Sequence, residues 1–345
     1  MLLEDFPLEI KAMIMSCAPD TETLRNITRA SPEFYSAYRG ARKEIFHKIT
    51  LTTLGKASLG MLDPWSATHV PHLNLDSPDR ERIVLEVLGR YRLRLPRDLD
   101  DVRLELDESL AILSLHRKLT DIVEGYCKQK LSHSPLPGEE PQEPLPPSKA
   151  ELHRLYRALY RYEFYSKLFG AGPGGVNTSV YHLDNAFNET KIVDLFLDLF
   201  PIHEVEEIAC MHKFASDHYD EKNVPWDLAS LGPSYLSRMM KATTRPKWLH
   251  LLSESPSINV TTMRRVLDAY ERVVDFGEWD WAGVNDTASK EHEPTTGWLW
   301  ASKRGIQNAD FKLRRWGYVF WDEERLKNWK IDEGTMNCFP WKIRE

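Results

Sequence analysis

The start of the chain decides its fold, and residues 3–45 read LEDFPLEIKAMIMSCAPDTETLRNITRASPEFYSAYRGARKEI. Signals for three helix starts divide this stretch. Pro7 suits the first turn of a helix, where its missing N–H needs no partner. Asp20 or Thr21 can cap a second helix. Ser-Pro-Glu at residues 31–33 can begin a third, which would carry Phe34, Tyr38, Ala41 and Ile45. The spacing therefore predicts a module of three short helices.

The first of these helices is apolar on two sides. At about 100° per residue, Phe6, Ile10 and Ile14 share one face of it. Leu8 and Met15 project from nearly the opposite side. Three helices of this length lie near the lower size limit for independent folding, so apolar surface stays exposed after they pack. Such a surface either docks on a partner protein or is covered by the rest of the same chain.

The apolar and capping residues of this stretch follow a recognisable order. They are Leu3, Phe6-Pro7, Glu9-Ile10, Ile14, Pro19-Asp20, Leu24, Ile27, Ala30-Ser31, Phe34, Tyr38 and Arg42. In this order and spacing they resemble an F-box, in the form common in filamentous fungi. Phe6 stands where that family usually has leucine. Residues 158–163, 168–170, 204–210 and 316–322 also look like segments of fungal F-box-like proteins.

This resemblance implies a mode of binding and no reaction, cofactor or metal. An F-box docks on a Skp-family adaptor, which binds a cullin scaffold, while the remaining chain presents a protein substrate for ubiquitination. Apolar anchors supply most of the energy of such an interface. The residues expected at or just beneath the contact are Phe6, Pro7, Leu8, Ile10, Ile14, Met15, Leu24 and Ile27. The alternative is a helical scaffold protein whose F-box-like helices pack on its own body and which has no ligase role.

Residues 132–148, SHSPLPGEEPQEPLPPS, divide the rest of the chain, because they offer almost nothing large to bury and predict a disordered linker or exposed loop. The F-box-like module then covers residues 1–49, a helical connecting region 50–131, and a helical region for substrate or partner recognition 149–345. Sustained strand alternation is scarce. We therefore expect a mainly α fold, a three-helix module followed by an irregular multi-helix domain with little or no sheet. Any sheet is expected near residues 318–320.

Capping and periodic apolar residues predict helices after the linker. Ser148 with Glu151 forms a capping box at the start of one of them. Apolar residues at helical spacing indicate further helices within residues 192–200, after Pro201 and within residues 259–277.

Tryptophan is concentrated towards the C-terminus. The residues are Trp279, Trp281, Trp298, Trp300, Trp316, Trp321, Trp329 and Trp341. Indoles usually bury most of their area, so we expect a rigid aromatic core. The alternatives are a peptide groove and the pocket of an uncatalogued helical enzyme. Basic and aromatic residues alternate over 303–318, as in nucleic-acid-binding segments, but acids such as Asp310 and Asp322 make ordinary ion pairing the better interpretation.

Composition and motifs favour binding over catalysis. The 345 residues are 42% hydrophobic with a net charge of -7, which gives no general attraction to nucleic acid or to an anionic membrane. No apolar run approaches the roughly 20 residues of a membrane span. Residues 170–175 are rich in glycine but lack the lysine of a phosphate-binding loop. No Gly-x-Ser-x-Gly or His-Glu-x-x-His motif is present.

Cysteine and histidine spacing predicts no metal site. The four cysteines lie far apart, and their spacing matches neither a disulfide framework nor a zinc motif. His203, Cys210, His212 and His218 share one predicted helical region, but no pair has the i, i+3 or i, i+4 spacing of ligands on adjacent turns. The start of the chain lacks the basic and apolar regions of a signal peptide, so we expect a protein of the cytoplasm or nucleus.

Overall fold

The computed structural model describes residues 3–70, 79–94, 103–136, 145–170, 187–223, 226–242, 244, 246–247, 250–251, 263–273, 294–302 and 311–331. All regular elements in these ranges are helical, which confirms the mainly α fold. The α-helices are α1 (Leu8–Ser16), α2 (Thr21–Ala30), α3 (Pro32–Gly40), α4 (Arg42–Gly55), α5 (Leu62–His69), α6 (Arg80–Arg94), α7 (Leu106–Tyr126), α8 (Lys149–Phe169), α9 (Glu189–Leu195), α10 (Ile202–Asp220), α11 (Pro233–Lys241), α13 (Met263–Val273), α14 (Thr296–Ser302), α15 (Phe311–Trp316) and α16 (Glu323–Asn328).

Shorter helical turns join these elements. They are η1 (Leu3–Asp5), the π-helical turn η2 (Cys127–Leu131), η3 (Leu197–Leu199), η4 (Trp226–Leu231) and η7 (Tyr318–Phe320). The expectation of a sheet near residues 318–320 is wrong, because the chain there forms a 3₁₀ turn. Gly317 enters it with φ 71°, and the N–H of Trp321 donates to the carbonyl of Tyr318.

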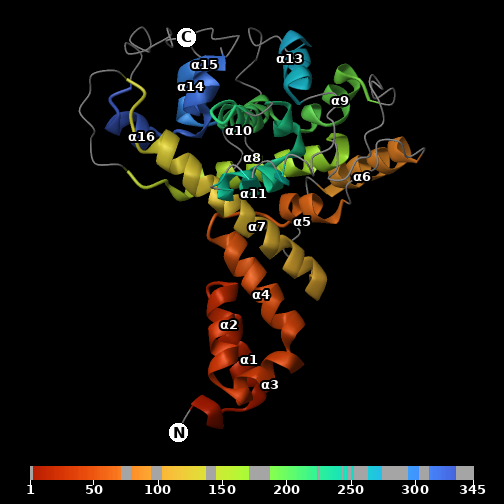
Figure 1. The fold of residues 1–345 in the computed structure, drawn as a ribbon, viewed down its shortest axis with the longest axis vertical. Coiled ribbons are helices and arrows are strands. Elements are labelled where there is room, and N and C mark those ends of the chain that lie inside the picture. The colour runs from red at the N-terminus through yellow and green to blue at the C-terminus, as the bar shows by residue number, and fades with distance from the viewer. Residues whose placement is uncertain are drawn as a thin grey trace.

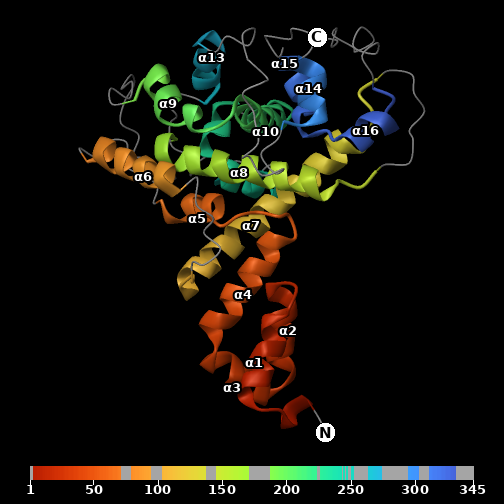
Figure 2. The same ribbon diagram turned by 180° about the vertical axis from the view of Figure 1, so that it is seen from behind.

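The molecule has a narrow stem and a broad body (Figure 1). We call residues 3–55, with η1 and α1–α4, the stem, and the remaining described residues the body. The stem projects from the body, and its tip carries η1, the beginning of α1, and α3 (Figures 1 and 2). The first residues of the chain are thus held far from most of the other helices.

The stem has a hydrophobic core of its own. The buried members of this core are Met15, Ala18, Leu24, Phe34, Ala37, Ile45, Phe46 and Ile49. Two of the predicted helix starts are observed: Asp20 Oδ1 accepts from the N–H of Thr23 at 2.7 Å, and Pro32 begins α3. The predicted third helix does not run on to Ile45, because Ala41 leaves the helical region at φ -124° and ψ 23°, directly after Gly40. A fourth helix, α4, follows and crosses residue 49.

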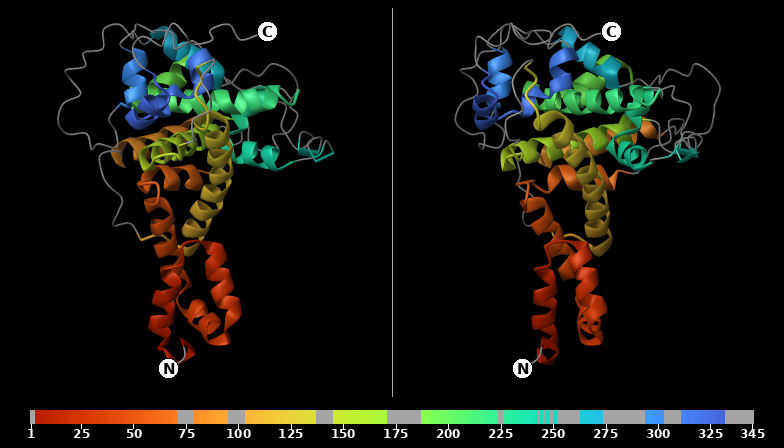
Figure 3. Two further views of the ribbon diagram at one scale, coloured as in Figure 1. Left: turned by 90° about the vertical axis from the view of Figure 1, so that its left-hand side faces the viewer. Right: turned by 60° about the vertical axis from the view of Figure 1, so that its left-hand side comes forward.

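Helix α7 and a few polar contacts connect the stem to the body. Leu106 and Leu113 of α7 pack against the stem core, whereas Leu119 of the same helix is buried in the core of the body. Figure 3 shows α7, drawn in ochre, running from the body down to the stem. Lys43 Nζ lies 2.5 Å from Glu105 Oε1, just before α7. The stem is therefore attached along one side.

The body is built on one continuous core that extends from Leu54 to Ile331. The connecting region and the region after residue 148 both contribute to this core. The predicted linker is described only at its two ends, and residues 137–144 lie outside the described part of the chain. Of the tryptophans, Trp298, Trp321 and Trp329 are buried in the core, while Trp279, Trp281 and Trp341 lie outside the described residues.

Helix α8 runs through the middle of the body. It begins at the predicted capping box: Ser148 Oγ accepts from the N–H of Glu151 at 3.1 Å, and Glu151 Oε2 accepts from the N–H of Ser148 at 2.9 Å. Most of its side chains are buried, polar ones included. Because α8 is covered on all sides, its arginines and glutamates need partners inside the protein.

Candidate partner-binding surface and buried charges

The structure separates the eight candidate contact residues into three groups. Pro7 and Leu8 are exposed, and Leu8 keeps 54% of its surface in solvent. Phe6, Ile10, Ile14 and Ile27 are half-buried. Met15 and Leu24 are buried in the stem core. A partner therefore cannot touch Met15 or Leu24 unless the stem opens. Of the eight candidate contact residues, these two lie beneath the surface.

The reason lies in the way α1 packs. Its Met15 side faces the interior of the stem, with Lys11 and Ser16 also buried. The side that carries Met13 faces outward, and Met13 is 52% exposed. Leu8 belongs to the inward side but lies at its outer end, where the tip leaves it uncovered. Periodicity identified both apolar sides of α1, but periodicity alone does not tell which one faces inward.

Three exposed apolar residues extend the candidate surface beyond the expected set. Leu3 is 61% exposed, and Met13 and Tyr35 are about half exposed. With Leu8 they are four of the eight large exposed apolar residues in the described part of the chain, although they lie within the first 35 positions. Tyr35 directly follows the buried Phe34, and two adjacent aromatic residues on a helix cannot both face the core. That pair was a signal in the sequence for an outward-facing aromatic side chain.

Besides the pair of Lys43 and Glu105, two polar contacts join the stem to residues outside it. His47 Nδ1 accepts from the N–H of Leu104 at 3.4 Å, and Lys56 Nζ donates to the carbonyl of Pro19 within the stem at 2.8 Å. Pro19 belongs to the turn between α1 and α2, at the end of α1 that is remote from the tip (Figure 1). Leu8 and Pro7, at the other end of α1, stay open to solvent.

The body contains a network of buried charges between α8 and α10. Arg157 lies 2.7 Å from Glu204 and 2.6 Å from Glu207. Arg161 lies 2.5 Å from Glu204 and 3.0 Å from Asp63 of α5. Burial opposes the charge of Arg161, but Asp63 and Glu204 outweigh it and raise the pKa of its guanidinium. The two arginines compensate most of the charge of the three carboxylates and join three helices, which is a structural role.

Two further arginines are held in the same way. Arg314 forms two bonds of 2.8 Å with Glu206, and Arg325 binds both oxygens of Glu151 at 2.6 and 2.7 Å. Glu151 therefore caps α8 and anchors α16 at once. Arg314 belongs to the basic and aromatic run at residues 303–318 that resembles nucleic-acid-binding segments. Its side chain is buried in an ion pair with Glu206.

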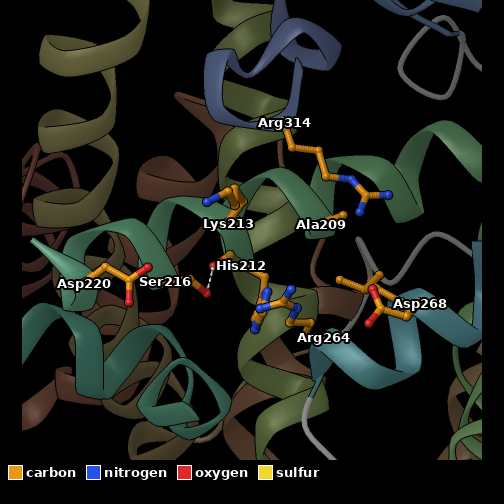
Figure 4. Close-up of a pocket in the computed structure, with 9 residues that line it drawn as sticks. Ala209, His212, Lys213, Ser216, Asp220, Arg264, Asp268 and Arg314 are labelled. Atoms are coloured by element: carbon orange, nitrogen blue, oxygen red, sulfur yellow. Dashed lines mark hydrogen bonds between the residues drawn. The ribbon is translucent and has the colours of Figure 1, made fainter. Parts of the chain in front are cut away.

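A cavity of about 240 Å³ lies between α10, α13 and α15 (Figure 4). Its lining includes His212, Lys213, Ser216 and Asp268. Ser216 Oγ donates to the main-chain carbonyl of His212 at 3.0 Å, so this hydroxyl is not paired with the imidazole. The imidazole therefore does not activate Ser216 as a nucleophile. The lining does bring ionisable groups together, which is what the enzyme alternative needs.

The described residues form neither a metal site nor a membrane-spanning helix. No group of three or more His, Cys, Asp or Glu side chains there is arranged to hold a metal ion. Cys210 and His212 lie buried on α10, and burial raises the pKa of the Cys210 thiol well above its usual value. None of the helices in the described ranges combines the length and the apolar character needed to cross a membrane.

Two histidines in the body make stability sensitive to mild acid. Burial lowers the pKa of His116 to about 4, and burial together with nearby cations lowers that of His212 to about 3. Below about pH 6.5 the unfolded chain binds protons at these sites that the folded protein does not bind. The stability they contribute is therefore complete above about pH 6.5 and is lost as the pH falls towards 4. We expect the free energy of unfolding to drop by about 2 kcal/mol or more between pH 7.5 and pH 5.

Urea unfolding followed by tryptophan fluorescence at the two pH values measures this drop. In His116→Gln it should shrink by at least about a third, since His116 no longer titrates, while His212 and the partly buried His218, whose pKa burial lowers to about 4, still do. An equal drop in the variant and the natural protein would show that His116 is not responsible.

Comparisons of this chain with protein-family models, with curated proteins and with solved structures gave no match. The projecting stem and its apolar tip are therefore the features on which a function can be based.

Proposed function

We propose that this protein is an F-box-type adaptor. Its stem tip binds a Skp-family subunit and through it a cullin scaffold, and its body holds a protein to be ubiquitinated. The observation that supports this function best is a helical stem that has its own core and exposes four apolar residues, Leu3, Leu8, Met13 and Tyr35. Leu3, Leu8 and Tyr35 belong to the elements that form the tip of the stem. The same stretch has the residue order that resembles an F-box.

The exposed side chains suit a protein partner energetically. Fully burying an apolar side chain of this size contributes about 1.5–3 kcal/mol, so each half-exposed residue at the tip can gain about 1 kcal/mol when a partner covers it. The helices beneath are already packed around Met15 and Leu24. Docking therefore requires little ordering of the stem, which favours affinity.

Binding between the full-length protein and a purified Skp-family adaptor tests this function. Replacing Leu8 by aspartate should weaken the complex by about 100-fold, because a charge would be buried at the centre of the contact. Leu8 does not belong to the stem core, so Leu8→Asp should fold and unfold like the natural protein. Isothermal titration calorimetry measures the affinity, and circular dichroism verifies the fold.

Leu85 of α6 provides the matched control. It is also a leucine on a helix, 42% exposed, but it belongs to the body. Leu85→Asp should bind the adaptor as the natural protein does. Docking at the tip is ruled out if no complex forms at micromolar concentration, or if Leu8→Asp and Leu85→Asp bind equally well.

The scaffold alternative has one observation in its favour. Leu106 and Leu113 of α7 cover part of the stem, so one side of it does pack on its own chain. Helix α7 contacts the side of the stem formed by α4 and leaves the tip open. A scaffold protein of this kind does not use the tip to bind its partners. In affinity capture, Leu8→Asp should then retain every partner of the natural protein, whereas an F-box-type adaptor should lose its Skp-family subunit.

A further inference from the structure

A basic segment of the body stands out in an acidic chain. Residues 228–253 contain four Lys or Arg residues and no Asp or Glu, whereas the whole chain has a net charge of -7. Helix α11 lies in this segment and packs beside α7 in the body (Figure 1). Arg238 and Lys241, near the end of α11, are both exposed. A protein that is negative as a whole therefore carries a local positive surface.

An open groove of about 560 Å³ lies between the end of α11 and residues 246–251. Arg238 and Lys241 line it from α11, and Lys247 lines it from the other side. None of its described lining residues carries a carboxylate. Lys241 is paired with Asp121 of α7, whose Oδ2 lies 2.5 Å from its Nζ. Three cations thus border the groove, and Asp121, outside its described lining, offsets part of their charge.

The three cations differ in how they are held. Arg238 lies over the ring of Tyr235, 5.9 Å from its centroid, and Lys241 is fixed by its pair with Asp121. Lys247 is exposed and has no partner among the described residues. Lys247 is therefore the cation that a negative group in the groove can pair with directly, while the other two contribute charge from fixed positions.

The groove also offers apolar surface. Ala242, Pro246 and Leu251 belong to its lining, and Leu251 packs against the core of the body. Tyr235 Oη donates to the main-chain carbonyl of Leu251 at 2.9 Å. This bond ties residue 251 to α11, so the two sides of the groove are connected before anything binds. A ligand that fits both features combines negative charge with an apolar side chain.

We propose that this groove binds an acidic segment of a partner protein, in which carboxylates flank apolar side chains. The carboxylates pair with Lys247 and are attracted by Arg238 and Lys241. The apolar side chains pack on Pro246 and Leu251. The volume lies within the roughly 300–1,000 Å³ of ligand pockets, so it accommodates a few side chains of an extended peptide.

A nucleic acid suits this groove less well than an acidic peptide does. Binding to a phosphate chain depends on many cation contacts, and three border the groove. The negative net charge of the protein also repels a long polyanion. As the place where the body holds a protein to be ubiquitinated, the groove rests on the proposed function, whereas its binding of an acidic segment does not.

Fluorescence polarisation with the full-length protein tests the groove. The probe is a labelled peptide of sequence Glu-Asp-Leu-Leu-Asp-Glu. One comparison peptide has serine in place of leucine, and another has glutamine and asparagine in place of the acids. We expect the probe to bind with Kd below about 100 µM and each comparison peptide to bind at least about 10-fold more weakly, because each lacks one of the two features.

Two exposed lysines separate the groove from general surface charge. Lys247 lines the groove, whereas Lys149 begins α8 and does not line it. Lys247→Glu should weaken binding of the probe by at least about 10-fold, and Lys149→Glu should leave it unchanged although the net charge changes equally. Asp121→Asn should tighten binding several-fold, because it removes the carboxylate paired with Lys241 and keeps an acceptor for the Ser237 hydroxyl.

The proposal is overturned if the probe shows no saturable binding at millimolar concentration. It is equally overturned if Lys247→Glu and Lys149→Glu bind the probe alike, if Asp121→Asn weakens binding, or if a single-stranded DNA oligonucleotide binds the groove and the peptide does not. Leu8→Asp, which should lose the Skp-family subunit, should bind the probe as the natural protein does. A failure of the groove and a failure of the stem tip are therefore told apart.

Discussion

Replacing Gly317 with alanine is expected to reduce the free energy of unfolding by about 3–5 kcal/mol. A Cβ atom at this position would lie 1.7 Å from Tyr126 Oη, well inside van der Waals contact. The backbone of Gly317 also has φ 71°, a conformation that residues other than glycine rarely adopt. Urea unfolding followed by circular dichroism measures the loss.

Two further variants show whether the clash is the cause. Gly89→Ala, within α6, adds a Cβ that meets nothing within 4 Å, so it should stabilise the protein by about 0.5–1 kcal/mol. Tyr126→Phe removes the obstructing hydroxyl, which is buried without a partner among the described residues, and should cost less than about 1 kcal/mol. Combined with Gly317→Ala it should restore about 1–2 kcal/mol. A double variant with no recovery would show that the clash is not the cause.

Replacing Arg157 with methionine should destabilise the protein by about 3–5 kcal/mol, since it leaves the buried Glu207 without its ion-pair partner and Glu204 with Arg161 alone. Glu204 and Glu207 are both almost completely buried and both bind this guanidinium. Burial already raises the pKa of Glu207 against the opposing effect of Arg157, and without Arg157 the pKa should rise further. Protonation would then relieve the repulsion, so the deficit should be smaller at pH 5 than at pH 7.

An exposed ion pair provides the comparison for this variant. Lys327 lies 2.6 Å from Glu323 on α16, and both side chains are mostly in solvent. Lys327→Met should change stability by less than about 0.5 kcal/mol. Adding Glu207→Gln to Arg157→Met should recover part of the loss, because it removes the carboxylate that has lost its ion-pair partner. A loss in Arg157→Met as small as that in Lys327→Met would contradict a stabilising role for the network.

Local signals in the sequence were enough to predict the mainly helical fold and several helix starts. Asp20, Pro32 and the capping box of Ser148 with Glu151 act through neighbours two to four residues away, so they can be read without knowing the rest of the fold. The apolar start of the chain also predicted a surface that its own helices leave open, and Leu8 lies on that surface.

Long-range packing explains what the sequence did not reveal. Whether Leu8 or Met15 is buried depends on how α1 lies against α3 and α4, and periodicity allowed either side. The apolar run at residues 318–320 suggested a strand, but a left-handed Gly317 turned it into a 3₁₀ helix. The cavity beside His212 combines helices distant in sequence, and spacing within α10 reveals none of its partners.

The same distance in sequence hid the buried ion pairs. Arg157 and Arg161 lie one turn apart on α8, which does place them on one side of the helix. Their carboxylates come from α10 and α5, up to 98 residues away along the chain. A charged residue on an amphipathic helix is normally expected in solvent, so only the packing of α8 inside the body shows that these arginines are internal.

Helix α7 belongs to both hydrophobic cores, and this has a mechanical consequence. Its 21 residues form a rod about 31 Å long that enters the stem core at one end and the body core at the other. A torque applied at the stem tip is then transmitted to the body through the rigid helix α7, and is not absorbed at a hinge. A protein bound at the stem tip would therefore keep a fixed angle and distance relative to the body.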